Sequence, residues 1–165
     1  ASLPEIRISF RNGRDGSHTF LGDECVDEAI RTIEVSSYVS PVAVIPEVRE
    51  FVDRILRDYG KAGRVVMDGR DIGTTVFPDA ELKIFMVADA NVRAMRRLKE
   101  MKASGSDADF DTVLENLKTR DYIDSHRETS PLRQAEDAIV LDNTDMTLED
   151  QMVWLRDIVR SRFGD

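Results

Sequence analysis

The chain has very little cysteine, and that limits its chemistry. Its 165 residues include one cysteine, Cys25, so no disulfide can form within the chain. A single unpaired thiol is typical of a reducing compartment and predicts a cytoplasmic location. No CxxC pair and no Cys/His zinc spacing occur, so the sequence predicts no metal site. The uncharged apolar runs are much shorter than the ~20 residues of a membrane helix, and we expect no membrane partner.

Positive charge and phosphate-binding loops are also scarce. Asp and Glu number 32 against 23 Lys and Arg, which gives a net charge of −9. Such a chain has no net positive field to release counterions from a polyanion, so we expect no nucleic-acid partner. The motif GxxxxGK[ST] is absent as well. The chain therefore has no P-loop with which to hold the phosphates of ATP.

The composition is that of an ordinary globular protein, with 41% hydrophobic and 33% charged residues. The length predicts one domain, or one domain with a small insertion. Alternating apolar residues and Asn12-Gly13 turn chemistry predict a β-hairpin within residues 5–22. Residues 23–39 fit no single period. Ser40 followed by Pro41 predicts a helix start, and Pro46 either kinks that helix or restarts it before Gly60.

The second half alternates short apolar segments with helical patterns. Strands are predicted at residues 64–67, 82–87 and 138–142, and a small, polar loop at residues 103–109. Helices are predicted after Asp89, from about Val113 to Arg127, and after the capping box formed by Thr147 and Asp150. Short apolar strands that alternate with helices indicate a parallel α/β sheet.

Ligands of such sheets bind beyond the carboxyl ends of the strands, and Asp68, Asp89 and Asp142 stand at the three predicted ends. The first end is the richest, because Arg70 and Asp71 follow within a glycine-loosened turn. These groups could bind a polar ligand. The plainer interpretation, a turn in which Asp71 pairs with Arg70, is equally compatible with the spacing.

A second candidate lies on the predicted helix before residue 127. Arg120, Asp124 and Arg127 share one face, where two guanidinium groups around a carboxylate could hold a phosphate. A solvent-exposed stripe of ion pairs explains the same spacing and, on the spacing alone, is the favoured interpretation. The basic group that includes Arg96 and Arg97 also fits an exposed helix face. No chemistry is assigned to Cys25, His18, His126 or Trp154.

Three blocks closely resemble bacterial-type cytidylate kinases, in that family's order and spacing. They are residues 40–50 (SPVAVIPEVRE), 68–88 (DGRDIGTTVFPDAELKIFMVA) and 120–132 (RDYIDSHRETSPL). The resemblance begins near residue 5 and does not include the family's first strand and P-loop. We therefore expect a C-terminal portion of a longer kinase, which is inactive alone.

The resemblance implies phosphoryl transfer from ATP, with Mg²⁺, to CMP or dCMP in pyrimidine nucleotide metabolism. It implies a nucleoside-monophosphate-kinase fold, here incomplete, with a CMP-binding insertion at residues 1–62, a core at 63–165 and a lid at about 97–119. Ser40, Arg49 and Asp71 match positions that bind the cytosine edge. Asp124 matches a ribose contact. The phosphate and the transferring group would meet Arg70, Arg120 and Arg127, and the ATP side of the lid would carry Arg96 or Arg97.

Two further expectations concern the missing family strand, which normally lies between residues 64–67 and 82–87. We expect the sheet to close this gap or to pair with a second chain, whereas the longer kinase would be a monomer.

A non-catalytic nucleotide-binding module is the alternative function. A phosphatase with an Asp nucleophile, using Asp68 and Asp71, is a poor third, because such carboxylates usually stand two residues apart and these stand three apart.

Overall fold

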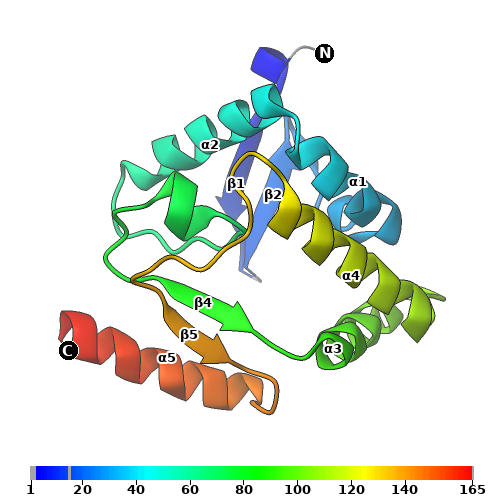
Figure 1. Ribbon diagram of the computed structural model, residues 1–165. Helices are drawn as coiled ribbons and strands as arrows, with labels where there is room; N and C mark the ends of the chain where they lie inside the picture. Colours follow the sequence, from blue (N-terminus) through cyan, green and yellow to red (C-terminus); the bar gives the residue numbers. More distant parts are fainter. Residues whose placement is uncertain (1–2, 15, 165) are drawn as a thin grey trace.

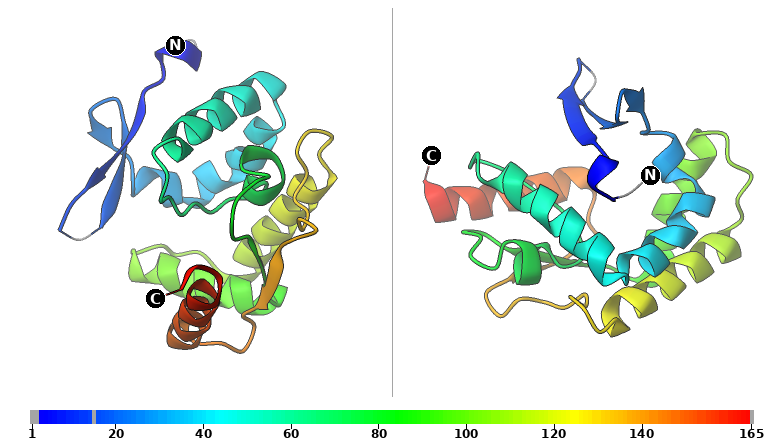
Figure 2. Two further views of the ribbon diagram at one scale, coloured as in Figure 1. Left: turned by 90° about the vertical axis from the view of Figure 1, so that its left-hand side faces the viewer. Right: turned by 90° about the horizontal axis from the view of Figure 1, so that it is seen from above.

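The computed structural model describes residues 3–14 and 16–164. The N-terminal part holds an antiparallel sheet and two helices, and the C-terminal part holds a parallel strand pair with three further helices (Figure 1). Helices α1 and α2 stand between the N-terminal sheet and α4 (Figure 2). No helix in the described ranges has the length and apolar character needed to cross a membrane.

The N-terminal sheet confirms the predicted hairpin. Strand β1 (Ile8–Asn12) pairs antiparallel with β2 (Ser17–Leu21), and a short β3 (Glu24–Cys25) pairs with the other edge of β2. Gly16 supports the turn because its φ of 137° is open to glycine. Tyr59 fastens the hairpin to α2, donating a hydrogen bond from its hydroxyl to the Ile8 carbonyl at 3.3 Å. Short 3₁₀ turns at Leu3–Glu5 and Ala29–Arg31 flank this sheet.

Two helices follow, and the start of the first differs from our expectation. Helix α1 spans Ile33–Ala43, so Ser40 and Pro41 lie inside it rather than at its beginning. Thr32 is the N-cap because its backbone is extended and its side chain accepts a hydrogen bond from the Val35 amide at 3.2 Å. Pro46 restarts the chain as α2 (Pro46–Gly60), standing in the first turn where its missing N–H has no cost.

The parallel pair consists of β4 (Ile84–Val87) and β5 (Ile139–Asp142), with α5 running alongside (Figure 1). Helices α3 (Ala90–Ala103), α4 (Phe110–His126) and α5 (Leu148–Phe163) agree with the expected pattern, and the loop between α3 and α4 lies where it was predicted. Asp89 caps α3, and the capping box of Thr147 and Asp150 starts α5.

The strand predicted at residues 64–67 is wrong. These residues form no regular structure, Val66 is fully exposed, and Arg64 has a positive φ of 54°. An apolar segment becomes a strand only where another strand satisfies its backbone groups. No described strand runs beside it, and the sheet does not close the gap, since β4 pairs only with β5 among the described residues.

A small core joins α3, α4 and α1 in the region expected to form the lid. Ala94, Leu98, Met101 and Val113 are buried together, and Ile33 of α1 packs against them. This contact brings α1 alongside α4 (Figure 1). The C-terminal halves of these two helices carry several of the residues that the sequence singled out.

Candidate functional site: a buried cluster of arginine and aspartate

Asp71 is the first centre of the cluster. It follows the irregular segment after residue 63 and precedes a single π-helical turn at Ile72–Val76, and its side chain is 8% exposed. Arg49 of α2 donates a hydrogen bond from Nη2 to its Oδ2. Arg127, which caps the C-terminus of α4, places Nη2 3.5 Å from Oδ1. Asp71 thus joins α2 to the end of α4, and the simple Arg70–Asp71 turn is not what forms.

Asp53 supports Arg49 from the same helix. It lies one turn after Arg49 on α2, with its Oδ1 3.6 Å from Arg49 Nη2. Burial raises the pKa of Asp53, and the neighbouring Arg49 charge opposes that shift. The Arg49 guanidinium therefore lies between two buried carboxylates, which hold its position.

Asp124 is the second centre and lies deeper, with 3% of its side chain exposed. It accepts hydrogen bonds from Ser40 Oγ at 2.8 Å and from Arg70 Nε at 3.0 Å. Arg127 Nη1 lies 3.7 Å from the same carboxylate. The Arg120–Asp124–Arg127 stripe is therefore not a solvent-exposed face, because two of its members are buried against α1 and the Asp71 turn.

Arg120 approaches the cluster from α4 and donates a hydrogen bond from Nη1 to Ser36 Oγ at 2.8 Å. Burial lowers the pKa of Arg120, and so does the like charge of Arg70. Burial also lowers the pKa of Arg127, assisted by the like charge of Arg49. A bound anion would relieve both effects, because it would add negative charge next to desolvated cations.

Several buried donors have no hydrogen-bond acceptor in the described part of the chain. These are Arg49 Nε, Arg120 Nε and Arg127 Nη2. The cluster holds four guanidinium groups, of Arg49, Arg70, Arg120 and Arg127, against the three carboxylates of Asp53, Asp71 and Asp124. The unused donors can bind a phosphate or a polar base edge, and the excess of one positive charge favours a phosphate.

A cavity of about 520 Å³ opens between α1 and α4 beside this cluster. Ser40 and Arg120 form part of its wall, together with Asn116 and Ile123. Asn116 also ties the two helices together, accepting from Ser36 Oγ and donating to Ser37 Oγ, each at 3.1 Å.

The remaining predicted site residues lie outside the cluster. Arg96 donates to three carbonyls of the loop after β5, those of Asn143, Thr144 and Met146, at 2.7–3.2 Å. Arg97 donates to the Arg31 carbonyl at 2.7 Å, which joins α3 to the N-terminal part.

The three aspartates at the predicted strand ends also lie apart from the cluster. Asp68 is exposed, Asp89 caps α3, and Asp142 accepts from the Thr144 amide and hydroxyl. Sequence analysis did not single out Asp53 or Ser36. The spacing of Arg49 and Asp53, four residues apart on a predicted helix, was a usable signal for the first.

Comparison with known proteins places the chain in a family. The family model described as cytidylate kinase matches residues 2–159. The chain is 52% identical over 156 residues to the cytidylate kinase of Phocaeicola vulgatus, covering 93% of this chain and 68% of that protein. The chain belongs to the cytidylate kinase family. A second family member, from Parabacteroides distasonis, is 52% identical over 166 residues, covering 99% of this chain and 72% of that protein.

Family membership confirms the resemblance read from the three sequence blocks. It makes the chain a nucleotide kinase, and the parallel strands with flanking helices agree with the nucleoside-monophosphate-kinase fold. The phosphatase alternative gains nothing from the structure, because Asp68 is exposed and Asp71 is engaged by two arginines.

Proposed function

We propose that the cluster is the acceptor site at which CMP or dCMP receives the γ-phosphoryl group of ATP. The observation that carries this proposal is the set of buried guanidinium donors that have no hydrogen-bond acceptor among the described residues, of which Arg120 lines the cavity between α1 and α4. Phosphoryl transfer depends mainly on positioning and on neutralising charge on the phosphate oxygens. Converging arginines provide both.

The base would be bound by Ser40, Arg49 and Asp71. Cytosine offers an exocyclic amine, which needs an acceptor, and a ring nitrogen and carbonyl, which need donors. Asp71 is the acceptor and Arg49 the donor in this proposal. Ser40 already donates its proton to Asp124. Its oxygen lone pairs therefore remain for the amine, a refinement of the expected role as donor.

The phosphate would be held by Arg70, Arg120 and Arg127. Arg70 is the most accessible of the three, because 39% of its side chain is exposed and its hydrogen bond to Asp124 uses Nε. Its terminal nitrogens can reach an incoming phosphate while Nε stays on Asp124. Asp124 would meanwhile orient Arg70 and Arg127 and accept a hydrogen bond from a ribose hydroxyl.

We further propose that the parts of the kinase occupy the residue ranges expected from the sequence. Residues 1–62 would form the acceptor-binding insertion and residues 63–165 the core, with a lid at about 97–119. Arg97 bonds to the Arg31 carbonyl, so lid and insertion are already in contact on one side. Closure of the lid would exclude water from the transfer. Arg97, and less directly Arg96, remain the candidates for the ATP side.

Family membership implies ATP as phosphoryl donor, and Mg²⁺ is the expected companion of its phosphates. The cluster does not fit a metal ion, because Asp53, Asp71 and Asp124 each face at least one guanidinium group. A hard cation needs oxygen ligands that are free of such partners. We therefore assign no residue of the cluster to Mg²⁺.

The test of the acceptor site is a binding measurement, since the 165 residues contain no P-loop motif. Calorimetric titration with CMP and with cytidine isolates the contribution of the phosphate. We expect CMP to bind more tightly, and Arg120→Met to weaken CMP at least tenfold, about 1.4 kcal/mol, while leaving cytidine unchanged.

The matched control is Arg93→Met. Arg93 lies on α3, outside the cluster, in an ion pair with Asp121 in which both side chains are about one-third exposed. We expect Arg93→Met to leave the affinity for CMP unchanged. Equal affinity of the Arg120→Met variant and the unaltered protein for CMP would show that Arg120 does not bind the phosphate.

A further inference from the structure

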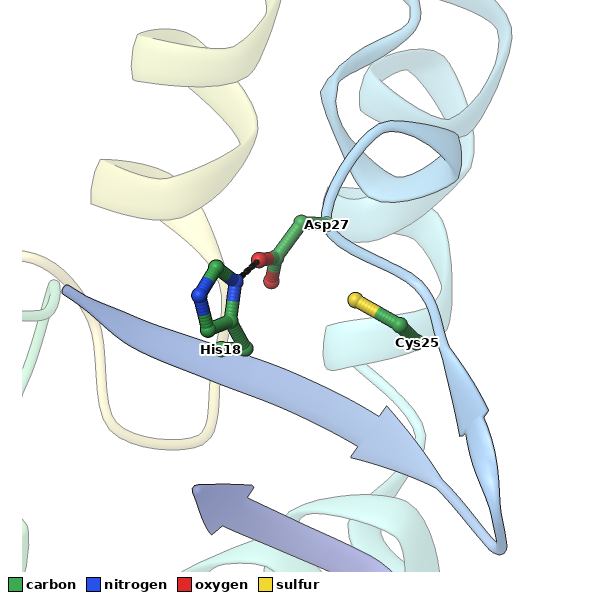
Figure 3. Close-up of side chains that lie close together, drawn as sticks. All are labelled: His18, Cys25 and Asp27. Atoms are coloured by element: carbon green, nitrogen blue, oxygen red, sulfur yellow. Dashed lines mark hydrogen bonds and ion pairs between the residues drawn. The ribbon is translucent and has the colours of Figure 1, made fainter. Parts of the chain in front are cut away.

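A second group of chemically active side chains lies on the N-terminal sheet, away from the acceptor cluster. His18 of β2, Cys25 of β3 and Asp27 just after β3 each offer one ligand atom, and these atoms all lie within 4.8 Å of one another. Figure 3 shows the three side chains converging on one face of the hairpin. His18 Nδ1 and Asp27 Oδ2 are 2.8 Å apart and hydrogen-bonded.

Strand pairing explains why these residues meet. Phe20 is opposite Cys25, and the Val26 amide donates to the Thr19 carbonyl at 2.9 Å, which continues the antiparallel ladder beyond β3. The Thr19 amide then donates to Asp27 Oδ1 rather than to the Val26 carbonyl, so the ladder ends there and Asp27 lies in the turn that follows. Side chains directly opposite, and those two residues along, share one face of a sheet. The pleat thus places the His18 imidazole and the Cys25 thiol on one face, and the hydrogen bond from the Thr19 amide brings the Asp27 carboxylate to them.

The Asp27 carboxylate is held in place by two hydrogen bonds. Asp27 Oδ1 accepts a hydrogen bond from the Thr19 amide at 2.8 Å. That bond, followed by the one with His18, holds the pKa of Asp27 below its ordinary value. The Thr19 amide also fixes the orientation of the carboxylate, which is the part that partner groups behind a metal ligand usually play.

We propose that His18, Cys25 and Asp27 form a binding site for a thiophilic divalent cation, with Zn²⁺ as the best fit. A thiolate and an imidazole favour Zn²⁺ over Mg²⁺ or Ca²⁺, which prefer oxygen ligands. Three protein ligands leave a fourth tetrahedral position for water. Binding would replace the proton that His18 and Asp27 share and would release the thiol proton of Cys25.

The required movement is small. Zinc bonds of ~2.0–2.3 Å at tetrahedral angles put neighbouring ligand atoms roughly 3.3–3.7 Å apart. The His18–Asp27 separation of 2.8 Å would widen slightly, and the exposed Cys25 would turn inward. The bound ion would fasten the two-residue β3 and the segment after it to β2.

The test is Zn²⁺ binding by the reduced protein, measured by competition with a chromophoric chelator. We expect one equivalent to bind, and Cys25→Ala or Asp27→Asn to weaken it at least tenfold. Cys25 is exposed, so its replacement reports on binding without disturbing a core. His126→Ala and Asp23→Asn are the matched controls, since both side chains are exposed and lie outside the group.

Cobalt substitution gives an independent readout. Co²⁺ bound by the protein should show a thiolate charge-transfer absorption that disappears in Cys25→Ala and persists in His126→Ala. Unchanged Zn²⁺ affinity in Cys25→Ala, or an equal loss in His126→Ala, would overturn the proposal. Neither measurement depends on CMP binding, so the outcome is separate from that of the acceptor site.

Discussion

Replacing Asp124 by asparagine removes one charge from the deepest part of the acceptor cluster with almost no change of shape. The carbonyl oxygen of the new side chain would keep the hydrogen bond from Ser40, but its amide would face Arg70 Nε, donor against donor. Arg127 would lose a carboxylate 3.7 Å away. We therefore expect Asp124→Asn to destabilise the fold.

The magnitude follows from the burial of the partners. Breaking a buried ion pair typically costs ~3–5 kcal/mol, because it leaves an uncompensated charge. Two features reduce the cost here. Arg70 is 39% exposed and can turn to solvent, and Arg127 keeps Asp71 and a hydrogen bond to the Ser130 carbonyl at 2.7 Å. We expect a loss of about 3 kcal/mol, at the lower end of that range.

Urea denaturation at neutral pH measures this loss, and Asp121→Asn is the matched control. Asp121 precedes Asp124 by three residues on α4 and pairs with Arg93 in two hydrogen bonds. Both side chains of that pair are about one-third exposed, so the same substitution should cost less than about 1 kcal/mol. An Asp124→Asn loss no larger than the Asp121→Asn loss would refute the claim that the cluster is desolvated.

Two further predictions concern helix caps. Thr147→Ala should destabilise the protein by about 1 kcal/mol, because Thr147 accepts from the Asp150 amide at 3.1 Å, whereas Thr147→Ser should be nearly neutral; urea denaturation separates the two. Asp109 has its pKa lowered by hydrogen bonds from Thr112, the backbone N–H foremost, so its contribution is present above pH about 4 and is lost as the pH falls through the lowered pKa. Between pH 7 and about pH 3, the unfolding free energy of Asp109→Asn should therefore fall less than that of the unaltered protein, and parallel curves would contradict this assignment.

Local signals in the sequence predicted local structure well. The hairpin turn near Gly13, the Asp89 cap and the capping box at Thr147 all depend on neighbours within a few residues, and all are present. Helix α1 began earlier than expected because two cap signals compete. Ser40-Pro41 resembles a helix start, but Thr32 satisfies the first amides of the helix and Pro41 is accommodated within it.

The strand predicted at residues 64–67 failed for a different reason. Its apolar, β-branched pattern is real, but a strand also needs a partner, and pairing is not a property of the segment itself. The irregular backbone after this segment still places Asp71 next to Arg49 in the first turn of α2 and Arg127 at the end of α4.

Spacing along the chain predicted which site residues share a face, but not whether that face is buried. The spacing of Arg120, Asp124 and Arg127 was also compatible with an exposed stripe. In the structure α1 packs against this face, where Ser36 accepts a hydrogen bond from Arg120 and Ser40 donates one to Asp124. The resemblance to a family supplied what spacing could not. The group of His18, Cys25 and Asp27 was missed because residues 23–39 gave no readable period, so the pairing of β2 with β3 could not be predicted.

The central claim is that Asp71 and Arg49 read the cytosine edge, and titration of the protein with CMP and UMP tests it most directly. UMP carries a carbonyl where CMP carries the amine, so it would face the Asp71 carboxylate acceptor against acceptor. We predict that CMP binds at least tenfold more tightly than UMP, about 1.4 kcal/mol, and that Asp71→Asn removes most of this difference. Asp121→Asn should leave the difference unchanged. Equal binding of CMP and UMP by the unaltered protein, or an undiminished preference in Asp71→Asn, would contradict the account.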